Sequence, residues 1–180
     1  MLPVAQLMIE HRLIERVIKL WKKELDRIAS SGKPNLCFIG SAIDFMQTYA
    51  DLCHHGKEED ILFRSLKKKP LSPQLNRMLE ELIAEHELAR KTVTELAAAK
   101  EKYAGGSKDA LDLLVESITS ITRIYPPHIE KEDKQFFIPV MNYFTGEEKD
   151  EMLADMRIFD QSIIHEKYKS QVARMEKTEV

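Results

Sequence analysis

Apolar residues recur at the period of an α-helix over four long stretches of this chain, and this pattern restricts the fold to packed helices. The stretches cover residues 4–28, 39–69, 73–104 and 107–144. Short breaks rich in Gly, Pro and Ser separate them, such as the SSGKPN segment at residues 30–35. Helices joined by short loops pack against their neighbours in an up-down-up-down order. We therefore predict an all-α fold built on an up-down-up-down four-helix bundle.

An additional C-terminal helix follows the fourth stretch. Thr145 and Glu148 form a T-x-x-E capping box, which favours a helix start. The expected buried face of this helix consists of Met152, Met156, Phe159 and Ile163. Within the fourth stretch, Pro126 and Pro127 lack backbone donors, and we expect them to kink or restart the helix. The predicted domains are the bundle, residues 1–144, and a C-terminal helix packed on it, residues 145–180.

Composition excludes several classes of protein. Of the 180 residues, 43% are hydrophobic and 32% are charged, which is typical of a globular chain rather than a disordered one. A formal charge of -3 argues against a nucleic-acid-binding surface, and no apolar run approaches the roughly 18 residues that span a membrane. No signal-peptide pattern opens the sequence, and Cys37 and Cys53 lie too far apart on one helix to pair. These features predict a cytoplasmic location.

Four histidines continue the apolar stripes and are expected to point into the bundle, one from each helix. They are His11, His54, His86 and His128. Two glutamates, Glu58 and Glu132, stand one turn after the second and fourth of these histidines and share their helix faces. A lone inward histidine is more often a core residue than a ligand. Four of them beside two buried carboxylates indicate a pair of divalent cations, because unpaired buried carboxylates are costly.

An internal repeat supports this assignment. The segment HHGKEEDILFRSL at residues 54–66 aligns without a gap on HIEKEDKQFFIPV at residues 128–140. The alignment pairs His54 with His128. Since neighbours on an α-helix diverge by about 100°, we expect His55 not to share the direction of His54.

Other polar residues near these motifs have less specific interpretations. Glu59 and Asp133 each follow a candidate ligand and are expected to be solvated or to support the ligands, with ligation by Asp133 left open. His165 is expected to lie on the surface or to hydrogen-bond between helices. Imidazole binds Zn, Fe, Cu and Ni, whereas carboxylate-bridged half-sites suit two Fe or Mn ions, so the sequence alone leaves the metal open.

Four segments together carry a family resemblance: EHRLIE, HHGKEEDILF, EHELAR and HIEKEDKQFFIP. In these segments the chain resembles the hemerythrin-like, or HHE cation-binding, family, and the resemblance spans residues 1–144. It implies a four-helix bundle around a non-haem pair of irons joined by an oxo or hydroxo bridge. It further implies a ligand set in which two imidazoles bind each iron and two carboxylates bridge them: His11 and His54 on one iron, His86 and His128 on the other, with Glu58 and Glu132 as bridges.

Arg90 departs from the family pattern. Oxygen carriers of the family have a further histidine one turn after the position of His86, where this chain has Arg90. A guanidinium cannot ligate a metal. We expect Arg90 to form a salt bridge with Glu15, or alternatively to contact a bound ligand, and the iron at His86 and His128 to have a vacant position.

Three functional hypotheses follow from the motifs and the resemblance. The first is a di-iron protein that carries or senses oxygen or nitric oxide, and the second is iron storage, iron sensing or repair of iron centres by the same site. If the protein is an enzyme, the expected reaction is reduction of peroxide or nitric oxide, although no separate catalytic residue is predicted. The third hypothesis is a metal-free helical interaction module. No nucleic-acid or membrane partner is expected, and the sequence does not indicate which protein would be a partner.

Overall fold

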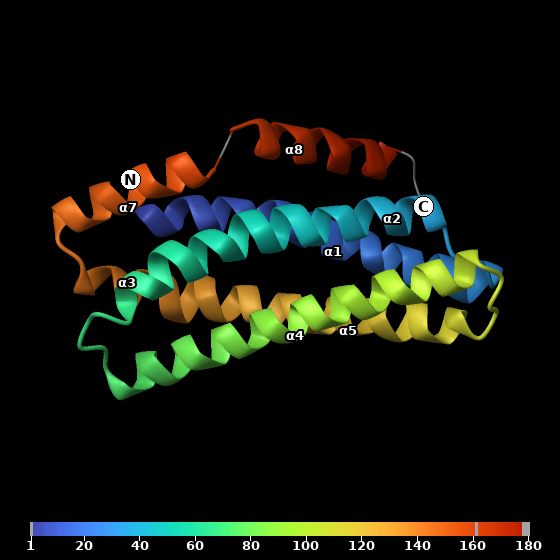
Figure 1. Ribbon diagram of the computed structural model, residues 1–180, viewed down its shortest axis with the longest axis horizontal. Coiled ribbons are helices and arrows are strands. Elements are labelled where there is room, and N and C mark those ends of the chain that lie inside the picture. The colour runs from blue at the N-terminus through green and yellow to red at the C-terminus, as the bar shows by residue number, and fades with distance from the viewer. Residues whose placement is uncertain (1, 161, 178–180) are drawn as a thin grey trace.

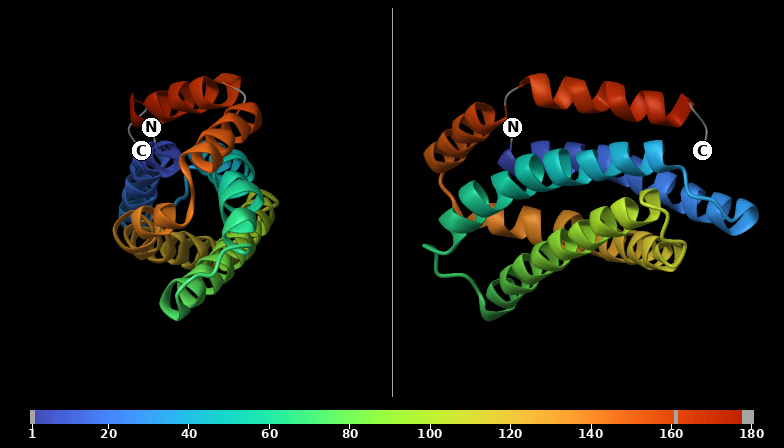
Figure 2. Two further views of the ribbon diagram at one scale, coloured as in Figure 1. Left: turned by 90° about the vertical axis from the view of Figure 1, so that its left-hand side faces the viewer. Right: turned by 45° about the vertical axis from the view of Figure 1, so that its right-hand side comes forward.

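The four helices of the bundle lie side by side with neighbouring helices antiparallel, as the computed structural model shows (Figures 1 and 2). The structure describes residues 2–160 and 162–177, and these residues contain helices and no strand. The first bundle helix is α1 (Pro3–Ser31) and the third is α4 (Pro73–Ala104). The second is the continuous run of α2 (Leu36–Phe45), the π-helices η1 (Met46–His55) and η2 (Glu58–Phe63), and α3 (Arg64–Leu66). The fourth consists of α5 (Ala110–Lys131), the π-helix η3 (Glu132–Phe136), α6 (Phe137–Val140) and the 3-10 helix η4 (Met141–Tyr143). The predicted all-α bundle is confirmed.

The helix ends coincide with the breaks in the sequence pattern. Gly32 ends α1 in the left-handed conformation, with φ 67°, and its N–H donates to the carbonyl of Ile28 at 2.8 Å. Ser72 begins α4, because its hydroxyl accepts a hydrogen bond from the N–H of Leu75 and a proline occupies the first turn. These ends fix the lengths of the helices and bring their midpoints together.

Of the kink or restart expected at Pro126 and Pro127, the restart does not occur. Helix α5 continues through both prolines to Lys131, and the irregular turn lies further along, in η3. Tyr125 and Ile129, on either side of the prolines, are buried in the core. Tertiary packing on both sides therefore keeps the segment helical despite the missing donors.

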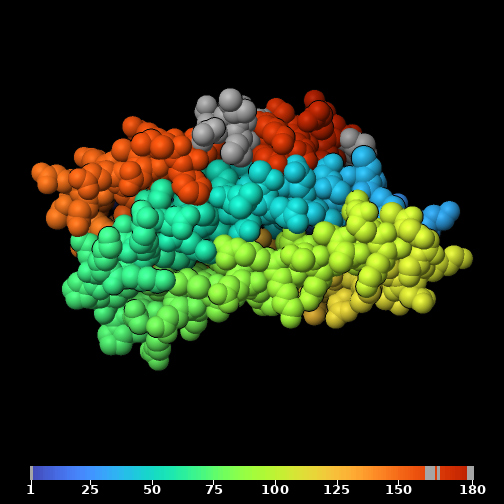
Figure 3. All heavy atoms as spheres, viewed as in Figure 1, coloured from blue at the N-terminus to red at the C-terminus, as the bar shows by residue number. Residues whose placement is uncertain are grey.

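Two C-terminal helices cover one side of the bundle, where a single helix was expected (Figure 3). The Thr145–Glu148 capping box is present and starts α7 (Gly146–Phe159), and after a break at Asp160 the chain continues as α8 (Ser162–Lys177). The carboxylate of Asp160 accepts a hydrogen bond from Gln6 of α1, which holds the break against the bundle. Met152 and Met156 are buried as predicted. Phe159 is 37% exposed, so its placement in the buried face was wrong, and the side chain of Ile163 lies outside the described residues.

The apolar core is divided into two clusters along the bundle axis, with a band of polar residues between them. On α1, Leu7 belongs to one cluster and Ile14 to the other, with His11 between them. On α4, Leu82 and Ala89 lie on either side of His86 in the same way. The buried polar residues are therefore enclosed by apolar layers at both ends. Among the described residues, no helix is both long and apolar enough to cross a membrane.

Candidate metal centre

The six predicted ligands converge at the middle of the bundle. Each is between 0% and 4% exposed: His11, His54, Glu58, His86, His128 and Glu132. The two carboxylate oxygens of Glu58 lie 3.3 Å from Nε2 of His54 and 3.4 Å from Nε2 of His86. One oxygen of Glu132 lies 3.2 Å from Nε2 of His11 and 3.2 Å from Nε2 of His128. The structure thus brings together residues that the sequence spreads over all four helices.

Irregular helix turns carry the two H-x-x-x-E motifs. His54 is near the end of η1 and Glu58 begins η2, while Glu132 begins η3. In a π-helix the hydrogen bonds run from i to i+5, and such turns occur often at functional sites. At the end of η1 this wider turn places two consecutive polar residues, His54 and His55, in the interior of the bundle.

The atoms that face the centre have no hydrogen-bond partner. Among the described residues, nine buried side-chain nitrogen and oxygen atoms are unpartnered, and one of them is the indole nitrogen of Trp21. The other eight are Nε2 of each of the four imidazoles and all four oxygens of Glu58 and Glu132. Buried polar groups are nearly always paired. These eight atoms are also the donor atoms that a metal requires, so the residues fit a metal centre.

A ring of carboxylates orients the four imidazoles from outside. In each case Nδ1–H donates to a carboxylate on a neighbouring helix of the bundle, at 2.6 to 2.8 Å: His54 to Glu10, His86 to Glu59, His128 to Glu85 and His11 to Asp133. This hydrogen bond fixes the ring and leaves Nε2 to face the centre. Glu59 and Asp133 therefore support the imidazoles, which is one of the two roles expected for them.

A cation neutralises each carboxylate of this ring. The pairs are Lys57 with Glu10, Arg90 with Glu59, Lys131 with Glu85, and Arg12 with Asp133. Lys57 is fully buried, whereas the side chain of Arg12 is 54% exposed. The inner imidazoles are therefore surrounded first by carboxylates and then by cations, so that charge alternates outward from the centre.

The carboxylates control protonation of the metal-free centre. Burial lowers the pKa of His54, but Glu58 and Glu10 outweigh it and raise the pKa to about 10. His86 behaves in the same way, and Glu132 and Glu59 help to raise its pKa to about 9. Burial raises the pKa of Glu132, yet the surrounding imidazoles hold it well below the ordinary value. At neutral pH, metal ions would therefore displace protons from these imidazoles.

His55 does not share the direction of His54, as expected, although it too lies inside the bundle. It is 1% exposed, and its ring stacks on that of His86 with the centroids 3.9 Å apart. Because η1 is a π-helix, successive side chains diverge less than in an α-helix. His54 consequently lies beside His11 of α1, with ring centroids 4.6 Å apart, while His55 lies beside α4.

Arg90 does not pair with Glu15. Its Nε donates to Asp51 at 2.7 Å and its guanidinium also donates to Glu59 at 2.6 Å, whereas Glu15 pairs with Arg12. Arg90 lies opposite the second bundle helix, where two carboxylates face it, and so cannot reach a partner on α1.

His165 hydrogen-bonds between helices, as one of its two expected roles predicted. Its Nδ1 lies 3.0 Å from the hydroxyl of Tyr49, and its Nε2 contacts Asp160. Cys53 is buried beside them, with Sγ 3.5 Å from Asp160, and both cysteines are free. Asp160 lies 3.4 Å from Nζ of Lys57, and Nε2 of His165 lies 3.8 Å from Glu10, so this group adjoins the outer pair of Lys57 and Glu10.

Sequence reasoning missed the outer carboxylates Glu10 and Glu85. Each immediately precedes an inward histidine, in the EHRLIE and EHELAR segments. The repeated Glu-His pair was a signal available in the sequence. Periodicity did not reveal it, because each glutamate serves the imidazole of another helix rather than its neighbour.

The fold and the centre define a class of protein: a four-helix bundle with a buried cluster of histidines and carboxylates suited to metal ions. Comparison with protein families agrees. The hemerythrin HHE cation binding domain matches residues 2–163, so the chain belongs to this family and is a metal-binding helical domain.

Curated relatives include uncharacterized proteins of Mycobacterium bovis and of two strains of Mycobacterium tuberculosis. Each is 21% identical over 131 residues, which is 73% of this chain. The chain spans about half the length of these relatives, since the match covers 50% of each. No solved structure matches the sequence significantly.

Proposed function

We propose that this chain is a non-haem di-iron protein that binds oxygen or nitric oxide at a carboxylate-bridged pair of irons. The observation that carries the proposal is the set of eight buried, unpartnered atoms on four imidazoles and two carboxylates. An isolated buried carboxylate costs several kcal/mol. Two divalent cations would satisfy all eight atoms, whereas without metal the two glutamates are compensated only by protons held on the facing imidazoles.

The arrangement of the imidazoles supports two ion positions. His11 and His54 would hold one ion, and their ring centroids are 4.6 Å apart. His86 and His128, with centroids 4.9 Å apart, would hold the other. Each of the two glutamates contacts one imidazole of each pair, so both carboxylates are suited to bridge the ions.

Iron is the metal that we assign to this centre. Mixed imidazole and carboxylate ligands suit iron, and manganese and zinc are the competitors to be tested. Membership of the hemerythrin family supports iron, since the oxygen carriers that the chain resembles use it. When bound, iron supplies redox chemistry and open coordination positions for a diatomic ligand.

The surrounding residues protect such a ligand from bulk water and let it approach. Phe63 lies parallel to the ring of His86, and Phe137 lies parallel to the ring of His11, with centroids 5.8 Å and 5.7 Å apart. A cavity of about 280 Å³ reaches inward to His55 and is also lined by Arg90 and Tyr125. It is large enough for a diatomic molecule and leads from the surface as far as His55.

Anaerobic loading with ferrous iron tests the proposal. We expect two irons per chain by metal analysis, and an absorption band that appears with oxygen or nitric oxide and disappears when the gas is removed. Oxidation followed by loss of iron would instead favour iron storage or donation. One equivalent of metal, or preferential loading with zinc under competition, would contradict the di-iron assignment.

A further inference from the structure

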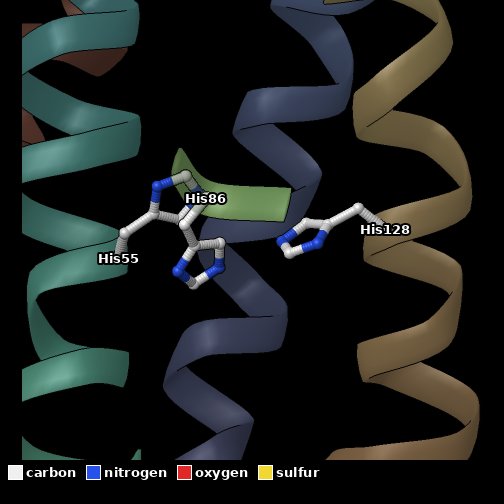
Figure 4. A group of neighbouring side chains, drawn as sticks. All are labelled: His55, His86 and His128. Carbon is white, nitrogen blue, oxygen red and sulfur yellow. The ribbon is translucent and has the colours of Figure 1, made fainter. Parts of the chain in front are cut away.

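His55 belongs to a second group of potential ligands that the six proposed ligands do not include. Its ligand atom lies within 4.8 Å of those of His86 and His128, and all three residues are buried. Figure 4 shows the three rings gathered around one space, His55 from η1, His86 from α4 and His128 from α5. The second bundle helix therefore contributes imidazoles to both halves of the centre.

A carboxylate holds the Nδ1–H of His55, as in each of the proposed histidine ligands. Its Nδ1–H donates to Asp51 at 3.3 Å, and Asp51 in turn accepts a hydrogen bond from Arg90. This repeats the order of imidazole, carboxylate and cation found around each of the other four histidines. Arg90 also pairs with Glu59, so one guanidinium supports the carboxylates of both His55 and His86.

The internal repeat shows that His55 is specific to one half of the centre. In the alignment of residues 54–66 with residues 128–140, His55 corresponds to Ile129. Ile129 is 3% exposed and packs in the apolar core. An isoleucine therefore suffices at this place for packing, and the imidazole needs another explanation. An imidazole buried beside two others, in a position where isoleucine suffices, is explained by ligation.

We propose that His55 supplies a third imidazole to the ion held by His86 and His128. This inference rests on the proposed di-iron function. The two ions are then unequal, with three imidazoles on one and two on the other. The ion at His11 and His54 has the more open coordination, which reverses the expectation of a vacancy beside Arg90. To ligate, the ring of His55 turns from its stacked position on His86, and the adjoining cavity gives it room.

Proton NMR of the cobalt-loaded protein counts the imidazoles directly. Each ligated imidazole that keeps its Nδ1–H gives one exchangeable signal shifted by the paramagnetic ion. We expect five such signals in the unaltered protein and four in His55→Ile. Isoleucine is chosen because Ile129 occupies the equivalent position in the other half of the repeat. Tyr125→Phe is the matched control, because Tyr125 stacks on His55 and its variant keeps the imidazole. It should give five signals.

The outcomes separate this inference from the proposed function. Two bound ions with four signals in the unaltered protein would overturn the role of His55 and leave the di-iron centre intact. No bound metal at all would overturn both. Counting signals in the unaltered chain needs no variant to fold. In a metal titration, His55→Ile should also lower the affinity for one ion by at least about tenfold. An unchanged affinity for both ions would contradict ligation by His55.

Discussion

Arg90 does not face the centre itself but hydrogen-bonds to carboxylates that in turn hold the imidazoles. Replacing it therefore tests whether these outer charges control metal affinity. Its guanidinium donates to Asp51 at 2.7 Å and to Glu59 at 2.6 Å. These carboxylates accept hydrogen bonds from His55 and His86. In Arg90→Ala both carboxylates lose their cation and are free to turn toward water. The imidazoles that they orient then become less well fixed.

The expected magnitude follows from where Arg90 sits. Its side chain is 36% exposed, so its ion pairs stabilise the metal-free fold by no more than about 1 kcal/mol. Loss of a partner that orients a metal-bound histidine typically costs about 10- to 100-fold in metal affinity. Because the carboxylates themselves remain in Arg90→Ala, we expect the lower end, about tenfold, which corresponds to about 1.4 kcal/mol. Affinity should thus change more than stability does.

The assay is an anaerobic metal titration against a chelator, combined with denaturant unfolding of the metal-free protein. Arg16→Ala is the matched control, because Arg16 donates from Nε to Glu176 at 2.8 Å and is 44% exposed, but contacts no carboxylate that holds an imidazole. It should bind metal like the unaltered protein. Equal affinity in the two variants would refute the reasoning. So would a loss of more than about 3 kcal/mol of metal-free stability in Arg90→Ala, which would make Arg90 a structural residue.

Three other perturbations separate the ligands from their surroundings. Glu58→Gln should lower the affinity for both ions by at least about tenfold, since it removes a bridging carboxylate. Glu24→Gln changes a buried carboxylate outside the centre and should retain both ions. Metal analysis measures the outcome, and loss of one ion alone would contradict bridging. Asp133→Asn should lower affinity for one ion only, measured by the same titration. The metal-free protein should lose stability between pH 7 and pH 10, because the pKa values of His54 and His86 are raised from 6.5 to about 10 and about 9. The stabilisation is complete below the pKa of histidine in the unfolded chain and disappears as pH rises through the pKa values of the folded protein. Equal stability against denaturant at pH 7 and pH 10 would contradict this expectation.

The parts of the centre that periodicity controls could be predicted from the sequence. His11 and His86 continue regular apolar stripes on α1 and α4, and both are fully buried. The capping box at Thr145 was equally visible, because both of its hydrogen bonds are local. Local rules therefore predicted the helices and the direction of the residues on regular turns.

The missed features depend on contacts between helices. His55 lies inside the bundle together with His54 because η1 is π-helical, so successive side chains diverge less than a 3.6-residue period assumes. The partners of Arg90 lie on the second bundle helix, and nothing in the sequence near Arg90 identifies Asp51 as one of them. At the break after α7, Asp160 accepts a hydrogen bond from Gln6, which is far away in the sequence. Each of these outcomes is decided by tertiary packing.

The ring of carboxylates makes the geometry of the centre a property of the whole bundle. Glu10 precedes His11 in the sequence, but its carboxylate orients His54 on the second bundle helix. His11 is oriented instead by Asp133 on the fourth bundle helix. A shift of one residue in α1 would therefore disturb two imidazoles, its own and that of the next helix. Because a carboxylate on Nδ1 leaves Nε2 to face the centre, only the correct alignment of all four helices presents four free nitrogens together. The unpartnered atoms at the centre are thus held in place by hydrogen bonds that do not involve the metal.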